Sequence, residues 1–273
     1  MNILDKIIER KKKEVVERQS LVPEKLLQKS IFFEGQPVSL KKYLFNPEKT
    51  GIIAEFKRKS PSKGWINQTA SVEKTTIGYM QAGASALSIL TDAEFFGGST
   101  EDLMTARKYN FCPILRKDFI IDEYQLLEAK SMGADCVLLI AAVLEPKRLE
   151  TLAKFAKGLG MEVLMEVHDR EELDRSLNPY LDVVGVNNRN LKTFEVSLDT
   201  SLSLVDSIPM EFVKISESGI SEPKTLIQLK SAGYQGFLIG ENFMRSIRPY
   251  QAAYNFMNEY RKLLSENTPK LAL

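Results

Sequence analysis

The chain has 273 residues, of which 44% are hydrophobic and 27% charged, a composition typical of globular proteins that excludes an intrinsically disordered chain. Its 37 basic and 36 acidic side chains give a formal net charge of +1, so we expect neither nucleic acid nor a membrane as partner. The two cysteines, Cys112 and Cys136, begin apolar runs outside any metal-binding spacing, which favours buried thiols in a reducing cytoplasm.

Residues 1–48 read as an N-terminal helical extension packed on the domain that follows. Apolar residues recur there at helical spacing, and Lys11 to Lys13 are expected on the solvent side of the helix. The apolar set is Ile3, Leu4, Ile7, Ile8, Val15 and Val16. We interpret this segment as a helix that closes one end of the following domain; a basic recruitment surface is the alternative.

From Gly51 onward, short apolar runs alternate with longer segments of helical periodicity. The predicted strands are "GIIAEFK", "ASALSILT", "CPILRKD", "DCVLLIAA", "EVLMEVH", "DVVGVNN", "FVKISES" and "GFLIG". Helices are predicted over 72–81, 100–109, 123–132, 146–159, 170–176, 198–205 and 223–231. Glycines that favour helix ends follow three of these helices, at Gly83, Gly133 and Gly233.

Eight strand–helix units within residues 49–265 predict a closed (β/α)8 TIM barrel, a single catalytic domain of the α/β class. An open doubly wound sheet is the competing fold. Its Gly-rich dinucleotide fingerprint is missing after the first strand, where the chain reads "KSPSKG".

The stretch "IIAEFKRKSPSKG" places an acid and a base at the end of the first strand. Side chains alternate across a strand, so Ile53, Glu55 and Lys57 share one face, and the fully apolar face suits the outer helices. Glu55 and Lys57 are therefore predicted inside the barrel, near the carboxyl ends of the strands, where barrel enzymes hold their active sites.

Four further strands end in the same way, with the polar residues Lys117, Glu166, Asn187, Arg189, Glu217 and Ser218. Any one strand end becomes polar simply because it meets solvent, but buried charges cost several kcal/mol unless paired, so five polar ends point to function. Three cations and three carboxylates in one rim suit an anionic ligand and general acid–base chemistry.

The last two units carry a phosphate-binding pattern, "SESGIS" and "IGENFM". Gly219 and Gly240 allow backbone N–H groups to approach an anion, and loops seven and eight are a recurrent phosphate site in barrels. Phe96, Phe119 and Leu138 are predicted near the same rim, as an apolar wall for a flat ring. Packing of the two phenylalanines between helices is the alternative.

Seven motifs together resemble the indole-3-glycerol phosphate synthase family of tryptophan biosynthesis, in order from about Ile3 to about Arg245. They are "IIAEFKRKSPSKG", "LSILTDAEFFGGS", "PILRKDFI", "GADCVLLI", "GVNNRNL", "ESGIS" and "FLIGENFMR". The resemblance implies a carboxy-lyase that needs neither metal nor cofactor. Its phosphorylated small-molecule substrate would be 1-(o-carboxyphenylamino)-1-deoxyribulose 5-phosphate, converted by ring closure, decarboxylation and dehydration.

The resemblance also implies roles for individual residues. Lys117 would be the general acid for ring closure, and Lys57, paired with Glu55, would hold the anionic groups of the substrate. Glu55 and Glu166 are both candidates for the base. Substrate-binding residues would be Ser60, Phe96, Phe119, Leu138, Asn187, Arg189, Glu217, Ser218, Gly219 and Gly240, whereas the single histidine, His168, is not expected to be catalytic.

Two other functions stay open from the sequence. A Schiff-base aldolase would use a strand-end lysine as its nucleophile, and a non-catalytic barrel would only bind sugar phosphates. We expect a monomer, with a weak homodimer as the alternative.

Overall fold

A computed structural model describes residues 3–191 and 193–267 of the chain. Eight parallel strands close into a barrel in the order β1-β10-β9-β8-β7-β6-β5-β4, with β4 paired to β1. Their bounds are β1 Ile52–Phe56, β4 Ala86–Leu90, β5 Ile114–Lys117, β6 Cys136–Ile140, β7 Glu162–Val167, β8 Val183–Asn187, β9 Val213–Glu217 and β10 Gly236–Ile239. The predicted (β/α)8 barrel and all eight predicted strands are confirmed.

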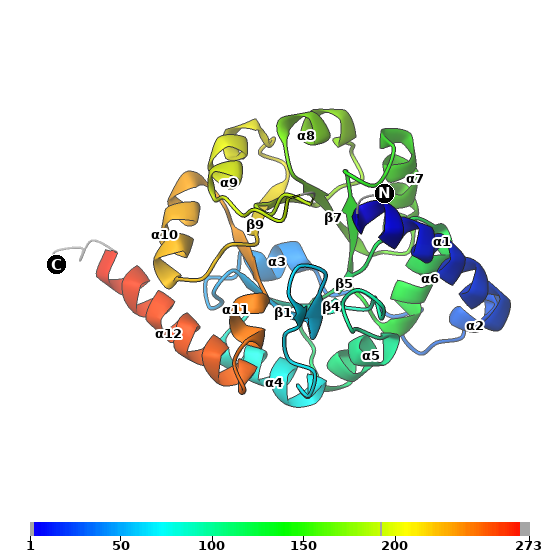
Figure 1. The fold of residues 1–273 in the computed structure, drawn as a ribbon, viewed down its shortest axis with the longest axis horizontal. Helices are drawn as coiled ribbons and strands as arrows, with labels where there is room; N and C mark the ends of the chain where they lie inside the picture. The colour runs from blue at the N-terminus through cyan, green and yellow to red at the C-terminus, as the bar shows by residue number, and fades with distance from the viewer. Residues whose placement is uncertain (1–2, 192, 268–273) are drawn as a thin grey trace.

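Helices surround this barrel (Figure 1). They are α4 Val72–Ala82, α5 Thr100–Tyr109, α6 Glu123–Met132, α7 Pro146–Gly158, α8 Arg170–Ser176, α9 Asp199–Leu204, α10 Pro223–Ala232, α11 Glu241–Met244 and α12 Pro249–Asn267, with a 3-10 turn at Val205–Ser207. The predicted glycines do close α4, α6 and α10 in the left-handed conformation. Helix α12 is an addition that the sequence patterns did not predict. None of the described helices is long and apolar enough to cross a membrane.

The two faces of each strand contribute to different hydrophobic cores, one inside the barrel and one between strands and helices. The alternation of side chains along a strand predicts this division. Ile52, Ala54 and Phe56 pack in the layer between strands and helices, whereas Ile53 packs inside the barrel. Cys112 and Cys136 are both free and buried, as predicted. The turn after β1 is more ordered than its Ser, Pro and Gly content indicates, because β2 (Lys59–Ser60) and β3 (Gly64–Trp65) pair there as a short antiparallel hairpin.

The N-terminal segment contacts both ends of the barrel through α1 (Ile3–Leu21), α2 (Glu24–Leu27) and α3 (Leu40–Leu44). Leu40 and Leu44 of α3 join the interior core. The N-cap of α3, Ser39, donates its hydroxyl to Glu162 Oε1, at the amino end of β7, over 2.6 Å. Helix α3 therefore closes the amino ends of the strands, while α1 lies against α6 and reaches the opposite rim (Figure 1).

Two expectations for α1 are wrong. Lys11 is only 1% exposed, and its Nζ lies 2.9 Å from both Asp92 and Asp118, in the loops after β4 and β5. Val16, expected on the packed face, is instead 66% exposed. The helix is rotated so that Lys11 faces the barrel, because two buried carboxylates offset the cost of desolvating its charge. Burial of Lys11 also argues against a basic recruitment surface built on Lys11 to Lys13.

Candidate active site

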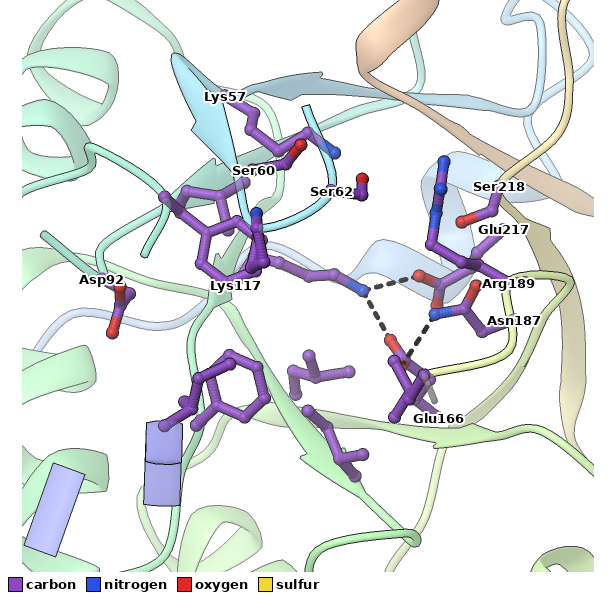
Figure 2. A pocket seen from close by; sticks show the side chains of 18 of the residues that line it. Lys57, Ser60, Ser62, Asp92, Lys117, Glu166, Asn187, Arg189, Glu217 and Ser218 are labelled. Atoms are coloured by element: carbon purple, nitrogen blue, oxygen red, sulfur yellow. Dashed lines mark hydrogen bonds and ion pairs between the residues drawn. The ribbon is translucent and has the colours of Figure 1, made fainter. Parts of the chain in front are cut away.

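A cavity at the carboxyl ends of the strands brings together most of the predicted site residues (Figure 2). It is lined by Glu55, Lys57, Ser60, Phe96, Lys117, Phe119, Leu138, Glu166, Asn187, Arg189, Glu217 and Ser218. The other two, Gly219 and Gly240, line an adjoining cavity that shares Glu55, Lys57 and Arg189 with the first. Segments far apart in the sequence thus meet at one mouth because all eight parallel strands end there.

Lys117 extends from the end of β5 into this cavity, between two carboxylates (Figure 2). Its Nζ lies 2.8 Å from Glu166 Oε2 and 2.6 Å from Glu217 Oε2. Burial opposes the positive charge, but Glu166, Glu217 and Glu55 outweigh burial and raise the pKa of Lys117 above its ordinary value. The side chain is therefore an ammonium group at neutral pH, which is the protonated form that a general acid needs.

The two carboxylates that share Lys117 differ in proton affinity. Burial raises the pKa of Glu166, but the positive charges of Lys117 and His168 outweigh burial and hold this pKa well below its usual range. Asn187 Nδ2 also donates a hydrogen bond to Glu166 Oε1 over 3.1 Å. Burial raises the pKa of Glu217 to about 7, with Lys117 opposing the shift and Glu166 adding to it. One acid is thus ionised while the other is poised to exchange a proton near neutral pH.

Gly185, in the middle of β8, makes room for Glu217. A Cβ at this position would lie 2.5 Å from Glu217 Oε1, closer than atoms tolerate. That oxygen is buried and has no hydrogen-bond partner within the described part of the chain. Sequence reasoning missed Gly185, because a glycine inside an apolar strand does not show which distant side chain approaches it.

Glu55 and Lys57 form the second acid–base pair, with Glu55 Oε1 2.8 Å from Lys57 Nζ. Ser88 Oγ, on the neighbouring strand β4, donates to Glu55 Oε2 over 3.2 Å. Ser60 lies in the hairpin beside Lys57 (Figure 2), and its buried hydroxyl has no hydrogen-bond partner among residues 3–191 and 193–267. A buried hydroxyl without a partner at a cavity wall is suited to a polar ligand.

Arg189 supplies the third cation and faces both cavities. Its Nη2 lies 3.5 Å from Glu241 Oε2, and Arg245 Nε approaches the other oxygen at 3.8 Å. These two arginines compensate the negative charge of Glu241, which otherwise disfavours an anion near Gly240. Ser218, with a φ of 67°, adopts the left-handed conformation that non-glycine residues rarely take and that is concentrated at functional sites.

One wall of the cavity is apolar. The rings of Phe96 and Phe119 contact each other with centroids 6.0 Å apart, and Leu138 lines the same cavity. Helix α1 adds Ile3, Leu4 and Ile7, which sequence reasoning did not assign to the site. Helical periodicity identifies an apolar face without showing what that face covers.

Comparison with known proteins agrees with this arrangement. The family model described as "Indole-3-glycerol phosphate synthase" matches residues 4–255. A protein named indole-3-glycerol phosphate synthase from Bacteroides thetaiotaomicron is 49% identical over 94% of this chain and 98% of its own length. A protein of the same name from Campylobacter fetus is 40% identical over 94% of this chain and 100% of its own length.

Among solved structures, one titled "Native KDPGal structure" matches with a TM-score of 0.57 at 15% identity, over 80% of this chain and 96% of its own, and supports the barrel fold alone. The family model and the curated relatives span nearly the whole sequence. The chain therefore belongs to the indole-3-glycerol phosphate synthase family.

Proposed function

We propose that this protein converts 1-(o-carboxyphenylamino)-1-deoxyribulose 5-phosphate into indole-3-glycerol phosphate, carbon dioxide and water, as a carboxy-lyase of tryptophan biosynthesis. Family membership supports the reaction. The observation that carries it is the position of Lys117 between Glu166 and Glu217 inside a cavity. The conversion moves protons and breaks carbon–carbon and carbon–oxygen bonds without net oxidation, which suits a site built from ammonium and carboxylate groups.

The lining of the cavity is suited to each part of this substrate. Lys57, Lys117 and Arg189 are cations for its carboxylate and phosphate, and the backbone around Gly219 and Gly240 is open to the phosphate. The wall formed by Phe96, Phe119 and Leu138 is suited to the anthranilate ring. Asn187 and Ser218 would position the substrate, and Ser60 would bind its carboxylate or phosphate through the hydroxyl that has no partner.

The protonated state of Lys117 supports its role as the acid. Lys117 would protonate the ribulose carbonyl oxygen while the ring carbon attacks, and loss of carbon dioxide would restore the aromatic ring. Lys57 would then protonate the departing hydroxyl, and Glu166 or Glu55 would accept the proton released in dehydration. A Schiff-base aldolase needs a neutral amine, and the raised pKa of Lys117 disfavours that chemistry.

We also propose that the protein acts as a monomer in the cytoplasm, without nucleic-acid or membrane partners. One chain supplies every charged group described at the site, and both cysteines are free thiols.

Lys117→Ala tests the proposal. It removes the proposed acid, so turnover of the substrate, followed by indole fluorescence, should fall by about 10²–10⁴-fold or more. Lys147→Ala, at an exposed position on α7, is the matched control and should keep the wild-type rate.

Absence of fluorescence with the wild-type protein would refute the activity. A Lys117→Ala rate within a few-fold of wild type would refute only the role of Lys117. Covalent trapping of a carbonyl substrate by borohydride would instead support the aldolase.

A further inference from the structure

The carboxylate of Glu166 contacts His168, the only histidine in the chain. His168 directly follows β7, and its Nε2 lies 3.4 Å from Glu166 Oε1, buried and with no hydrogen-bond partner among the described residues. On the other side of the ring, Nδ1 lies 3.0 Å from Glu172 Oε2. The imidazole therefore stands between two carboxylates, one of which also pairs with Lys117.

The start of α8 fixes this arrangement. Glu172 lies in the first turn of the helix, and its Oε2 also accepts the backbone N–H of His168 over 2.8 Å. Asp169, the N-cap, accepts from the backbone N–H of Glu172 over 2.8 Å. The side chains of His168 and Glu172 are only 12% and 14% exposed. The Nδ1 side of the imidazole is thus held by a carboxylate that is itself restrained, and its Nε2 side faces Glu166.

The two carboxylates around Lys117 outnumber its single positive charge. One ammonium group faces both Glu166 and Glu217, an imbalance that favours protonation of one carboxylate. Burial opposes a charge on His168, but its contacts with Glu166 and Glu172 outweigh burial and raise its pKa to about 10. Besides Glu172, three acids and two cations line the same surface hollow as His168: Asp5 of α1, Asp169, Glu195, Arg175 of α8 and Arg189. These five groups leave one net negative charge, which favours an imidazolium in the same direction as the two glutamates that contact the ring.

We propose that His168 is a positioning residue for Glu166: held by Glu172 as an imidazolium, it keeps Glu166 ionised and fixed beside Lys117. This sets which of the two carboxylates around Lys117 is free to accept a proton. The effect on turnover rests on the function proposed above, whereas the pairing itself does not.

Nuclear magnetic resonance of untagged protein labelled with 15N and 13C in histidine tests the pairing, since the chain contributes one imidazole signal. The wild-type imidazole should be doubly protonated at neutral pH and titrate near pH 10. Glu172→Gln and Glu166→Gln should each lower the midpoint by about one unit or more, because each removes a neighbouring negative charge.

Asp174→Asn, on the same helix but with its side chain 53% exposed, is the matched control and should leave the midpoint unchanged. A wild-type midpoint at or below about 6.5, the ordinary value for histidine, would overturn the proposal.

Kinetics test the consequence. His168→Gln should lower kcat on the order of ten- to a hundredfold and leave KM little changed. Loss of a residue that orients a functional side chain has effects of this size at metal sites. The acidic limb of its kcat/KM profile should move to higher pH, because Glu166 loses a neighbouring cation. His168→Lys should return that limb toward its wild-type position.

A folded His168→Gln variant with the wild-type profile would overturn the proposal. If that variant does not fold, Glu172→Gln takes its place, because it keeps the imidazole. The acidic limb of its kcat/KM profile should move in the same direction by a smaller amount, and an unmoved limb would overturn the proposed role of His168. The magnetic resonance measurement uses no substrate, so it reports the protonation of His168 even in a protein without activity. Absence of turnover in the wild-type protein would therefore refute the proposed activity and leave the test of the His168 pairing intact.

Discussion

At the scale of single residues, the site separates the proton affinities of two neighbouring carboxylates. Glu166 and Glu217 contact the same ammonium group, yet the pKa of Glu166 is lowered while that of Glu217 is raised to about 7. The difference arises because Glu166 has the imidazole of His168 3.4 Å away and Asn187 as an additional donor, whereas Glu217 Oε1 has no partner within the described residues. Groups with unlike pKa values in one site are how a fold provides both an acid and a base at neutral pH.

Gly240→Ala tests how closely Glu55 must be held. The φ of Gly240, −124°, is open to any residue, but an added Cβ would lie 2.5 Å from Glu55 Oε1 and 3.0 Å from Glu55 Cβ. Glu55 must then move away from Lys57. We expect kcat/KM to fall on the order of a hundredfold, since displacements of about 1 Å have such effects. Stability should fall by about 1–3 kcal/mol, measured by denaturant unfolding.

Gly158→Ala is the control for this substitution. Gly158 ends α7, and no heavy atom lies within 4 Å of its added Cβ. Activity should be unchanged and stability should rise by about 0.5–1 kcal/mol, because alanine loses less backbone entropy in a helix. Full activity in Gly240→Ala would show that the orientation of Glu55 is not needed for turnover.

At the scale of elements, α1 belongs to the active site although it precedes the barrel in the sequence. Its residues Ile3, Leu4 and Ile7 line the cavity, and Lys11 fastens it to Asp118, the residue next to Lys117. Arg18, about two turns further along the helix, pairs with Glu128 of α6. The helix is thus held to the barrel by charges as well as by apolar packing.

Lys11→Met should release α1 from the rim. The change leaves Asp92 without its ammonium partner and Asp118 with one partner fewer, and breaking buried pairs costs about 3–5 kcal/mol. We expect faster hydrogen exchange in the amides of α1 and a KM raised several-fold, because the helix lines the cavity. Lys12→Met, at an exposed neighbouring position, should change neither quantity. Wild-type exchange rates in Lys11→Met would mean that apolar contacts alone hold the helix.

At the scale of the whole molecule, the barrel divides stability and chemistry between its two ends. Leu40 and Leu44 of α3 fill the amino end together with interior residues such as Ile53 and Leu164. The charged groups of the candidate site occupy the carboxyl end. This polarity is usual for barrel enzymes, because the loops that follow the strands can vary while the opposite end supports the fold.

Leu40→Ala separates the two ends. Leu40 is 1% exposed, so its truncation should lower the free energy of unfolding by about 2–5 kcal/mol. Values of kcat and KM should stay close to wild type while the protein is folded, because no residue of α3 lines the cavity. Leu26→Ala, 56% exposed on α2, should change stability by about 0.5 kcal/mol or less. A marked loss of kcat in Leu40→Ala would show that the two ends are coupled.

The sequence by itself determined the parts that depend on local periodicity. Alternation along "IIAEFK" placed Ile53 and Glu55 inside the barrel, because successive side chains of a strand point to opposite faces. Polar residues at the ends of parallel strands placed Lys117, Glu166 and Glu217 at one rim, because every strand of such a barrel runs in the same direction. Those rules need no knowledge of which residues meet.

Only the tertiary structure decided the partners. Lys11 reads as a solvent-facing lysine, since nothing near it in the sequence reveals the buried carboxylates of Asp92 and Asp118 that hold it. His168 likewise reads as a loop residue until the fold sets it against Glu166 and Glu172. The energy of a buried charge depends on the distance to its counter-charge and on the exclusion of water, and both quantities exist only once the barrel has closed.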